Sequence, residues 1–413
     1  MHRMPGYTFF SFCDAVTARG CMLVLMVVAS APVGVMPAAA QDLTVTGQVR
    51  PRYEYRDPVG GEKDDFSSMR TRLAVRSVTE SGLTVFAQLQ DVRLFGEEGH
   101  PLFDYSADGL DLHQGYLRFQ GQRAPWLTTT VGRMESPLGG ERLIGAVGWA
   151  QQGQSFDGVR FDIQTDRTHW VVSGFIVGED SAPAAGREED LLSIYGTIED
   201  VGPGHLEVYW LNDRISAGTE SDEHLIGSRY VFGGSIFGRA EATIARGTRA
   251  DSDVSAYMFG GRAGTLLGDE GQLSATVWYD YLSGDDPDTQ DIEVFNTFFG
   301  TNHKFYGFAD LFLNIPSHTG GAGLQDLAVK LLYRPDADLS VGLDVHTFRA
   351  ADGSNLTDSH FGEEVDLTVT RPYMENLTAT FGLSRVFQAD GLAEIGRLSE
   401  SMTWFYVMLN ATF

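Results

Sequence analysis

Arginines recur at alternate positions in the first part of the sequence. Arg50 and Arg52 are two residues apart, and so are Arg70 and Arg72. In an extended chain alternate side chains share one face, so each pair places two guanidinium groups side by side. A guanidinium presents donors in a fixed fork that binds a carboxylate or phosphate through two hydrogen bonds. This pattern predicts a surface that binds anions.

Acidic residues follow the same alternation and give a second interpretation of the arginines, as partners in ion pairs. The basic residues of this parity concentrate early in the chain, whereas acids dominate the last third. An electric field across the space between these two regions is therefore as good an interpretation as a uniformly anion-binding surface. The bases are Arg50, Arg52, Arg70, Arg72, Arg76, Arg118, Arg160, Arg229, Arg239, Arg262, Lys330 and Arg334. The acids are Glu54, Asp162, Glu207, Glu241, Asp280, Asp326, Asp344, Glu364 and Asp366.

No motif in the sequence predicts catalysis, a metal site or a cofactor. Serines, histidines and acids occur on the same parity, but no spacing indicates a nucleophile with its base. The run Asp285-Asp286-Pro287-Asp288 has ligands for calcium, yet it reads better as a solvated loop. Gly260-Gly261 is followed by no strand-to-helix pattern and is not a phosphate loop. We therefore expect no catalytic residues, no metal ligands and no cofactor.

The elements that carry these residues read as long strands. Leu327, Val329 and Leu331 alternate with Asp326 and Lys330, and the same period recurs along the chain. The segments run about 10–13 residues, longer than typical soluble strands and close to the length that crosses a bilayer at a tilt. One face of each segment is apolar, as expected for strands that face lipid on one side and a lumen on the other.

The connections between these segments alternate in length. Short turns fall near residues 80–82, 120–125, 165–167, 200–204, 232–235, 267–270, 335–338 and 372–376. Between them lie longer polar connections at 57–66, 96–109, 136–153, 179–188, 213–222, 284–322, 350–359 and 388–401. This rhythm predicts an all-β transmembrane antiparallel barrel with short periplasmic turns and long extracellular loops. Placing 303–313 inside a loop leaves about 18 strands. The alternative is a soluble all-β repeat protein, which would not need connections that alternate between short and long.

The two ends of the chain support export and membrane insertion. Arg19, an apolar run at 22–35 and Ala38-Ala39-Ala40 predict a signal peptide over 1–40, followed by one barrel domain over 41–413. Both cysteines, Cys13 and Cys21, fall in that leader. Phe405, Val407, Leu409 and Ala411 alternate up to a terminal Phe413, which resembles the signal read by the barrel insertion machinery.

Composition excludes one class of partner. The chain has 413 residues, 30 basic and 56 acidic, with a net charge of −26. No basic excess is present to neutralise phosphates, so we expect no nucleic-acid binding.

Several segments resemble the alginate-export outer-membrane porins. They are SSMRTR (67–72), DLHQGYL (111–117), VGRMESPLGGERLIGAVGW (131–149), QGQSFDGVR (152–160) and TNHKFYGFADLF (301–312). The resemblance implies an eighteen-stranded, monomeric pore that passes an acidic polysaccharide through an electropositive constriction. The constriction residues it implies here are Arg72, Arg133, Arg142, Arg160 and Lys304.

Three further arginines, Arg52, Arg70 and Arg118, are predicted to line the pore from the alternation alone. Arg133 shares the parity of Val131, so its exposure to the lumen requires either an inward Val131 or a bulge. Arg142 and Lys304 lie in loops and reach the pore only if those loops fold inward. We expect an outer-membrane channel for an acidic saccharide or another anion. The alternatives are an outer-membrane enzyme acting on lipid or polysaccharide, and a non-conducting structural or adhesive barrel.

Overall fold

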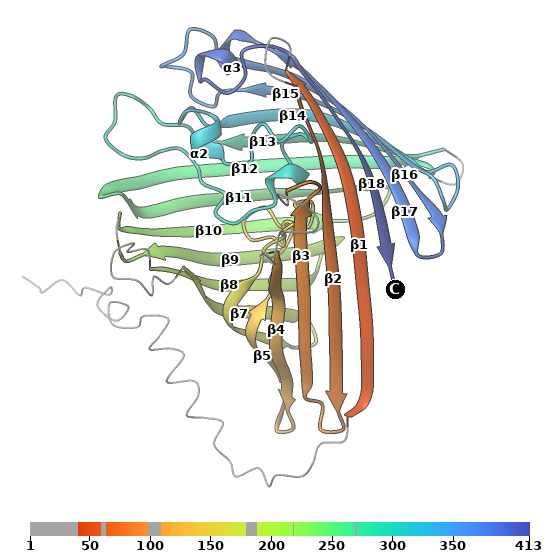
Figure 1. Ribbon diagram of the computed structural model, residues 1–413. Coiled ribbons are helices and arrows are strands. Elements are labelled where there is room, and N and C mark those ends of the chain that lie inside the picture. The colour runs from red at the N-terminus through yellow and green to blue at the C-terminus, as the bar shows by residue number, and fades with distance from the viewer. Residues whose placement is uncertain (1–39, 59–62, 98–108, 179–187, 218, 269–270) are drawn as a thin grey trace, which may run out of the picture.

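The computed structural model describes residues 40–58, 63–97, 109–178, 188–217, 219–268 and 271–413 (Figure 1). The predicted signal peptide therefore lies outside the described residues, apart from Ala40, at which the first strand begins. Among the described residues, no helix is long and apolar enough to span a membrane.

Eighteen antiparallel strands form one closed barrel, and the predicted fold is confirmed. Each strand pairs with its neighbours in sequence, and β18 pairs with β1 to close the ring. The strands are β1 (Ala40–Pro58), β2 (Asp64–Thr79), β3 (Thr84–Leu94), β4 (Leu110–Gly121), β5 (Ala124–Met134), β6 (Phe156–Gln164), β7 (Thr168–Gly178), β8 (Glu189–Val201), β9 (Gly204–Ile215), β10 (Ser221–Phe232), β11 (Ile236–Arg249), β12 (Ser252–Leu267), β13 (Leu273–Leu282), β14 (Leu324–Tyr333), β15 (Ser340–Arg349), β16 (His360–Met374), β17 (Leu377–Gln388) and β18 (Met402–Thr412).

We call β1–β6 the near wall and β10–β16 the far wall. In Figure 1 β1–β4 of the near wall run steeply down the front, and β10–β14 of the far wall cross behind them. Opposite walls of a barrel cross in this way because every strand is tilted to the barrel axis.

Short and long connections gather at opposite ends of the barrel, here called the turn end and the loop end. The connection from β13 to β14 holds only η2 (Asn302–Lys304) and α2 (Ile315–His318), so residues 303–313 lie in a loop as predicted. Another short helix, α3 (Asp390–Glu394), precedes β18. One loop-end connection is short: Ala250 and Asp251 join β11 to β12, both with left-handed backbone angles.

The alternation divides the wall into two faces. Leu327, Val329, Leu343 and Val345 lie on the outer face, with exposed fractions of 37–46%. Exposed apolar side chains on the outer face form the band that contacts lipid in such barrels. The predicted lipid-facing parity of these strands therefore holds.

Part of the interior is packed rather than open. Near the loop end the inner face carries Leu191, Leu211, Leu225, Leu282 and Leu324, each at most 1% exposed. Two loops bring further apolar side chains against them, among which Phe295, Phe305, Phe312 and Ile315 are buried. Those loops remove this inner apolar face from water, so the protein has a hydrophobic core inside the barrel.

Candidate functional site

Two loops fold into the lumen and bind each other. The first inner loop (135–155) joins β5 to β6, and the second inner loop (283–323) joins β13 to β14. Ile144 and Phe299 form a parallel bridge between them. The N–H of Gly145 donates to the Phe299 carbonyl at 3.0 Å, and Thr301 Oγ1 donates to Glu141 at 3.1 Å. The loops therefore act as one body.

Three arginines of the near wall hold the first inner loop by its backbone. Arg50 donates to the carbonyls of Gly148, Trp149 and Ala150 at 2.8–3.0 Å. Arg70 donates to Ala150 at 3.2 Å, and Arg52 donates to Trp149 at 2.9 Å. We call these three residues the arginine clamp. Their donors are used by the protein itself, which fixes segment 148–151 across the lumen.

The same loop reaches the far wall through Arg142. Its guanidinium lies 3.1 Å from Glu241 on β11 and 3.0 Å from Asp280 on β13. It also donates to the Tyr306 hydroxyl at 2.7 Å and lies 4.3 Å from the Phe305 ring. Burial alone would lower the pKa of Arg142, but these partners raise it above its ordinary value. Arg142 is therefore a buried, permanently charged anchor.

Two buried carboxylates of β16 hold the second inner loop. Glu364 accepts from the N–H of Ala309 at 2.7 Å, and Asp366 accepts from the N–H of Phe308 at 3.3 Å. Gly307 has a φ of +82°, and a Cβ there would lie 2.5 Å from the Glu364 carboxylate. Only glycine fits this approach without strain. Inward acids of the far wall are thus used to position a loop.

Arg72 lies in a polar cluster where the first inner loop leaves the near wall. It donates to Gln90 at 2.7 Å and lies 3.3 Å from Glu135, which in turn lies 2.7 Å from His113. Burial alone would raise the pKa of Glu135, but the His113 and Arg72 contacts lower it below the usual value. Glu135 is therefore held as a carboxylate.

The Arg72 cluster includes the residue types of a hydrolase triad. Ser155 Oγ lies 3.3 Å from His113 Nδ1, while Glu135 contacts the other ring nitrogen. Arg72 Nη2, however, is 2.8 Å from that same Nε2 atom. Arg72 and Glu135 thus both contact Nε2 and hold the His113 ring in place within the cluster.

Two cavities along the near wall are lined by the predicted pore residues Arg72, Arg118 and Arg160. One of about 130 Å³ is lined by Arg118 and Arg160 with Tyr116, Thr130 and Glu135. Arg160 itself is bound to Asp162 through two contacts, at 2.8 and 3.0 Å, and to Ser136.

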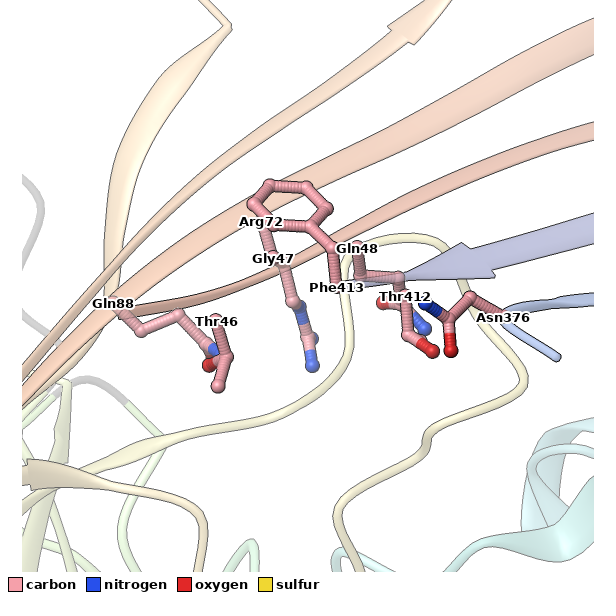
Figure 2. A pocket seen from close by; sticks show the side chains of 8 residues that line it. All are labelled: Thr46, Gly47, Gln48, Arg72, Gln88, Asn376, Thr412 and Phe413. Carbon is pink, nitrogen blue, oxygen red and sulfur yellow. The ribbon is translucent and has the colours of Figure 1, made fainter. Parts of the chain in front are cut away.

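The other cavity, of about 450 Å³, lies where the barrel closes. Its lining residues Gln48, Arg72, Gln88, Asn376 and Thr412 point to one side of the wall (Figure 2). The ring of Phe413 lies on the opposite side, over Gly47, where an added Cβ would meet it at 2.1 Å. Phe413 and Gly47 also exchange two backbone hydrogen bonds.

The sequence model for alginate export proteins matches residues 41–394, nearly the whole barrel. The chain belongs to the alginate export family. No curated protein matches its sequence.

Solved structures with the same fold share little sequence with this alginate export family member. Acinetobacter baumannii OccAB4 has a TM-score of 0.64 at 11% identity, over 92% of this chain and 100% of that one. Pseudomonas aeruginosa OccK9 (OpdG) has a TM-score of 0.63 at 13% identity, over 91% and 99%. Pseudomonas aeruginosa OccK3 (OpdO) has 0.62 at 14%, over 91% and 96%. Family and fold make this protein a bacterial outer-membrane β-barrel of the channel type.

The predicted site residues fall into separate groups in this family member. Arg52 and Arg70 belong to the clamp, while Arg72, Arg118 and Arg160 line the two near-wall cavities. Arg142 is buried at the far wall. Lys304 is half exposed, donating to the Gly140 carbonyl at 3.3 Å.

Arg133 lies outside the lumen. It pairs with Asp157 at 2.6 Å, and the register places both residues on the parity of Val131 and Val159. The register between β4 and β5 has no shift at Arg133, so the bulge that would turn it inward is absent there. The expectation that Arg133 lines the constriction is therefore wrong.

Sequence reasoning also missed functional neighbours. Gln90, His113, Glu135 and Gln151 complete the near-wall contacts of the arginines. Gln90 follows the inward alternation of β3, which was a usable signal. Nothing in the sequence indicated that Gln151 would return to Arg50.

Proposed function

We propose that this barrel is a passive channel for an anionic solute, most simply an acidic saccharide. The observation that carries the proposal is the unequal exposure of the inward charges. The inward acids of the far wall are largely covered: Asp280, Asp326, Glu364 and Asp366 are each at most 2% exposed. Arg76 and Arg118, on the same inward parity, are exposed. A solute in the open part of the lumen therefore meets mainly guanidinium groups, which select anions.

The ion pairs of the lumen support the same conclusion. Glu207 is bound to Arg229 at 2.5 Å, Asp344 to Lys330 at 2.7 Å and Asp162 to Arg160 at 2.8 Å. These acids are already neutralised and add little to the field that a solute meets. The strongly negative net charge of the chain thus does not describe its lumen.

The two inner loops supply the constriction of the proposed channel. They meet at the Ile144–Phe299 bridge and are fastened to both walls. Turns on the periplasmic side and loops outside would place this constriction toward the cell exterior. We further propose that the barrel works as a monomer and that Phe413 directs its insertion.

Ion selectivity in planar bilayers tests the proposal. The double variant Arg76→Glu, Arg118→Glu reverses two exposed lumen charges that carry little packing. We expect anion selectivity in the native protein and a reversal potential shifted toward cations in the variant. The shift should fade in molar salt, where the Debye length falls to about 3 Å.

Arg133→Gln is the matched control because Arg133 lies on the outer parity. It should leave the reversal potential unchanged. A native channel that selects cations would contradict the proposal. A folded barrel without conductance would favour the adhesive or structural alternative, and turnover of a lipid or polysaccharide by purified protein would favour the enzyme.

A further inference from the structure

The closure of the barrel leaves part of β1 without a neighbour on one side. β18 ends at Thr412, whose partner on β1 is Gln48. Gly47 still exchanges two backbone hydrogen bonds with Phe413, at 2.9 and 3.1 Å. Residues 42–46 continue toward the turn end and pair only with β2 among the described residues. Figure 1 shows β1 and β2 extending well beyond the C-terminus. We call residues 42–46 the open edge.

The backbone of the open edge has groups available for pairing. In an antiparallel sheet, alternate residues of a strand direct their N–H and C=O groups to the same neighbour. Gly47 directs both groups toward β18, so Val45 and Leu43 direct theirs to the same side. Phe413 is the last residue on that side. The open edge therefore presents the N–H and C=O groups of Val45 and Leu43 in the geometry that an added strand requires.

The sequence of the open edge does not block such pairing. Proteins usually protect an edge with lysine, proline or a bulge. The segment Asp-Leu-Thr-Val-Thr contains neither lysine nor proline, and the register shift of β1 lies before it, between Ala40 and Asp42. Its side chains are all exposed, Leu43 at 66% and Val45 at 53%. Its threonines and valine are β-branched and favour an extended chain. The open edge is therefore accessible and already in the conformation of a strand.

The cavity of about 450 Å³ at the barrel closure lies beside the open edge (Figure 2). Thr46 and Gln48 of β1 line it together with Asn376 and Thr412. A strand added along the open edge continues where β18 stops. Alternate side chains of that strand then point inward, toward this cavity. The protein therefore has room for the inward side chains of an added strand.

The inner face beside the open edge is basic. Thr44 and Thr46 share the inward parity of Gln48, and Arg76 of β2 lies opposite Thr44. Arg76 is exposed and forms no ion pair among the described residues. Neighbouring strands are about 4.8 Å apart, so the long Arg76 side chain can extend over the small Thr44 toward an added strand. Acidic side chains on the inner face of that strand would match this charge.

We propose that the open edge is a strand-addition site for an extended segment of a periplasmic protein. The segment runs antiparallel to β1, with apolar residues outward beside Leu43 and Val45 and acidic residues inward. In this mode of recognition, backbone hydrogen bonds supply affinity and alternate side chains supply specificity. The short turns of such barrels are periplasmic, so the partner comes from that side. The site goes beyond the proposed channel, because it would hold another protein at the turn-end opening.

Fluorescence anisotropy with the barrel purified from outer membranes tests the site. The probe is a short labelled peptide in which valine alternates with glutamate. A peptide residue opposite Val45 shares its outward face and exchanges hydrogen bonds with it, so the valine N–H groups face β1. We expect N-methylation of the valines to weaken binding about tenfold or more, and N-methylation of the glutamates to have little effect. Replacing the glutamates by lysine should also weaken binding.

Variants of the open edge test the same contact from the protein side. Val45→Pro removes an N–H that faces the open edge and leaves the hydrogen bonds to β2 in place. We expect it to weaken binding of the unmethylated peptide about tenfold or more. Val45→Ala is the matched control because it shortens the same side chain but keeps the N–H, and its loss should be smaller.

Equal binding of the two methylated peptides overturns the site, and this result needs only the native protein. Equal binding of the glutamate and lysine peptides overturns the acidic partner. A dimer of the barrel that Val45→Pro dissociates would assign the open edge to a second copy and overturn the proposal as well. Peptide binding does not require conduction. A failed titration therefore leaves the proposed function standing, and a barrel without conductance leaves the site standing.

Discussion

The near and far walls use arginine in opposite ways. On the near wall Arg50 and Arg70 donate mainly to backbone carbonyls of the first inner loop. On the far wall Arg142 is enclosed by carboxylates and aromatic rings within the hydrophobic core. One wall therefore binds a loop by neutral acceptors, and the other by buried charge pairs. Alternation in the sequence places the near-wall arginines inward, but it gives no position for Arg142, which lies in a loop.

The difference matters for energetics. A buried ion pair leaves an uncompensated charge when one partner is removed, whereas a lost bond to a carbonyl leaves only a neutral acceptor. We therefore expect substitutions at the far-wall contacts to destabilise the fold strongly. Substitutions at the near-wall contacts should release the loop with a smaller loss of stability.

Removal of the far-wall anchor should have the largest effect. Arg142→Met leaves Glu241 and Asp280 buried without their cation, and we expect a loss of about 3–5 kcal/mol in the free energy of unfolding. Urea unfolding of the refolded barrel measures it. Adding Glu241→Gln and Asp280→Asn to Arg142→Met should recover much of the loss. No recovery would mean that Arg142 acts by packing alone.

A charge on the lipid face of the far wall should rank next. Leu343→Arg puts a cation against the bilayer and should cost about 2–4 kcal/mol near the midplane. Folding yields in vesicles measure this. Ser340→Arg, on the lumen face of the same strand near its turn end, should cost less because its side chain does not contact lipid. Equal penalties would contradict the assignment of the lipid face.

Release of the near-wall clamp should cost less stability but change conduction. Arg50→Met removes charged hydrogen bonds to carbonyls and should cost about 1.5–3 kcal/mol. Segment 148–151 then loses its main support, so single-channel conductance should rise. Arg50→Lys, which keeps the charge, separates support from electrostatics. Unchanged conductance in both variants would show that segment 148–151 does not limit flow.

The outer pair of the near wall should matter least. Arg133 and Asp157 are partly exposed, with 33% and 56% of their side chains accessible. Exposed pairs contribute about 0.2–1 kcal/mol, so Arg133→Gln should shift unfolding by no more than that. Repeating the measurement in high salt should reduce even this difference. A larger effect would place Arg133 in a tighter environment than its contacts indicate.

Most of the fold could be predicted from local alternation in the sequence. Strand length, loop rhythm and the terminal pattern at Phe405–Phe413 were sufficient for an eighteen-stranded barrel, because each depends on neighbouring residues only. The alternation also flagged Arg133 as inconsistent with a lumen position, and the structure places it on the outer face.

The interior could not be predicted in the same way. Arg142 and Glu241 are 99 residues apart, and Arg50 and Gln151 are 101 apart. Such contacts depend on how two loops fold back into the barrel, which no local period encodes. Asp344 is an example of a contact that was missed. Its inward parity was predicted, but its ion pair with Lys330 at 2.7 Å was not. Substitution there therefore breaks an ion pair as well as changing the lumen.

The arginine clamp binds backbone carbonyl oxygens, which every amino acid possesses. Because Arg50, Arg52 and Arg70 contact the carbonyls of residues 148–150, they tolerate many changes in the side chains of that segment. Ala150, which also lines a cavity of about 610 Å³ at the loop end, can therefore vary without loosening the loop. Evolution, or an engineer, can change side chains at the entrance while the hydrogen bonds that hold the loop backbone stay the same.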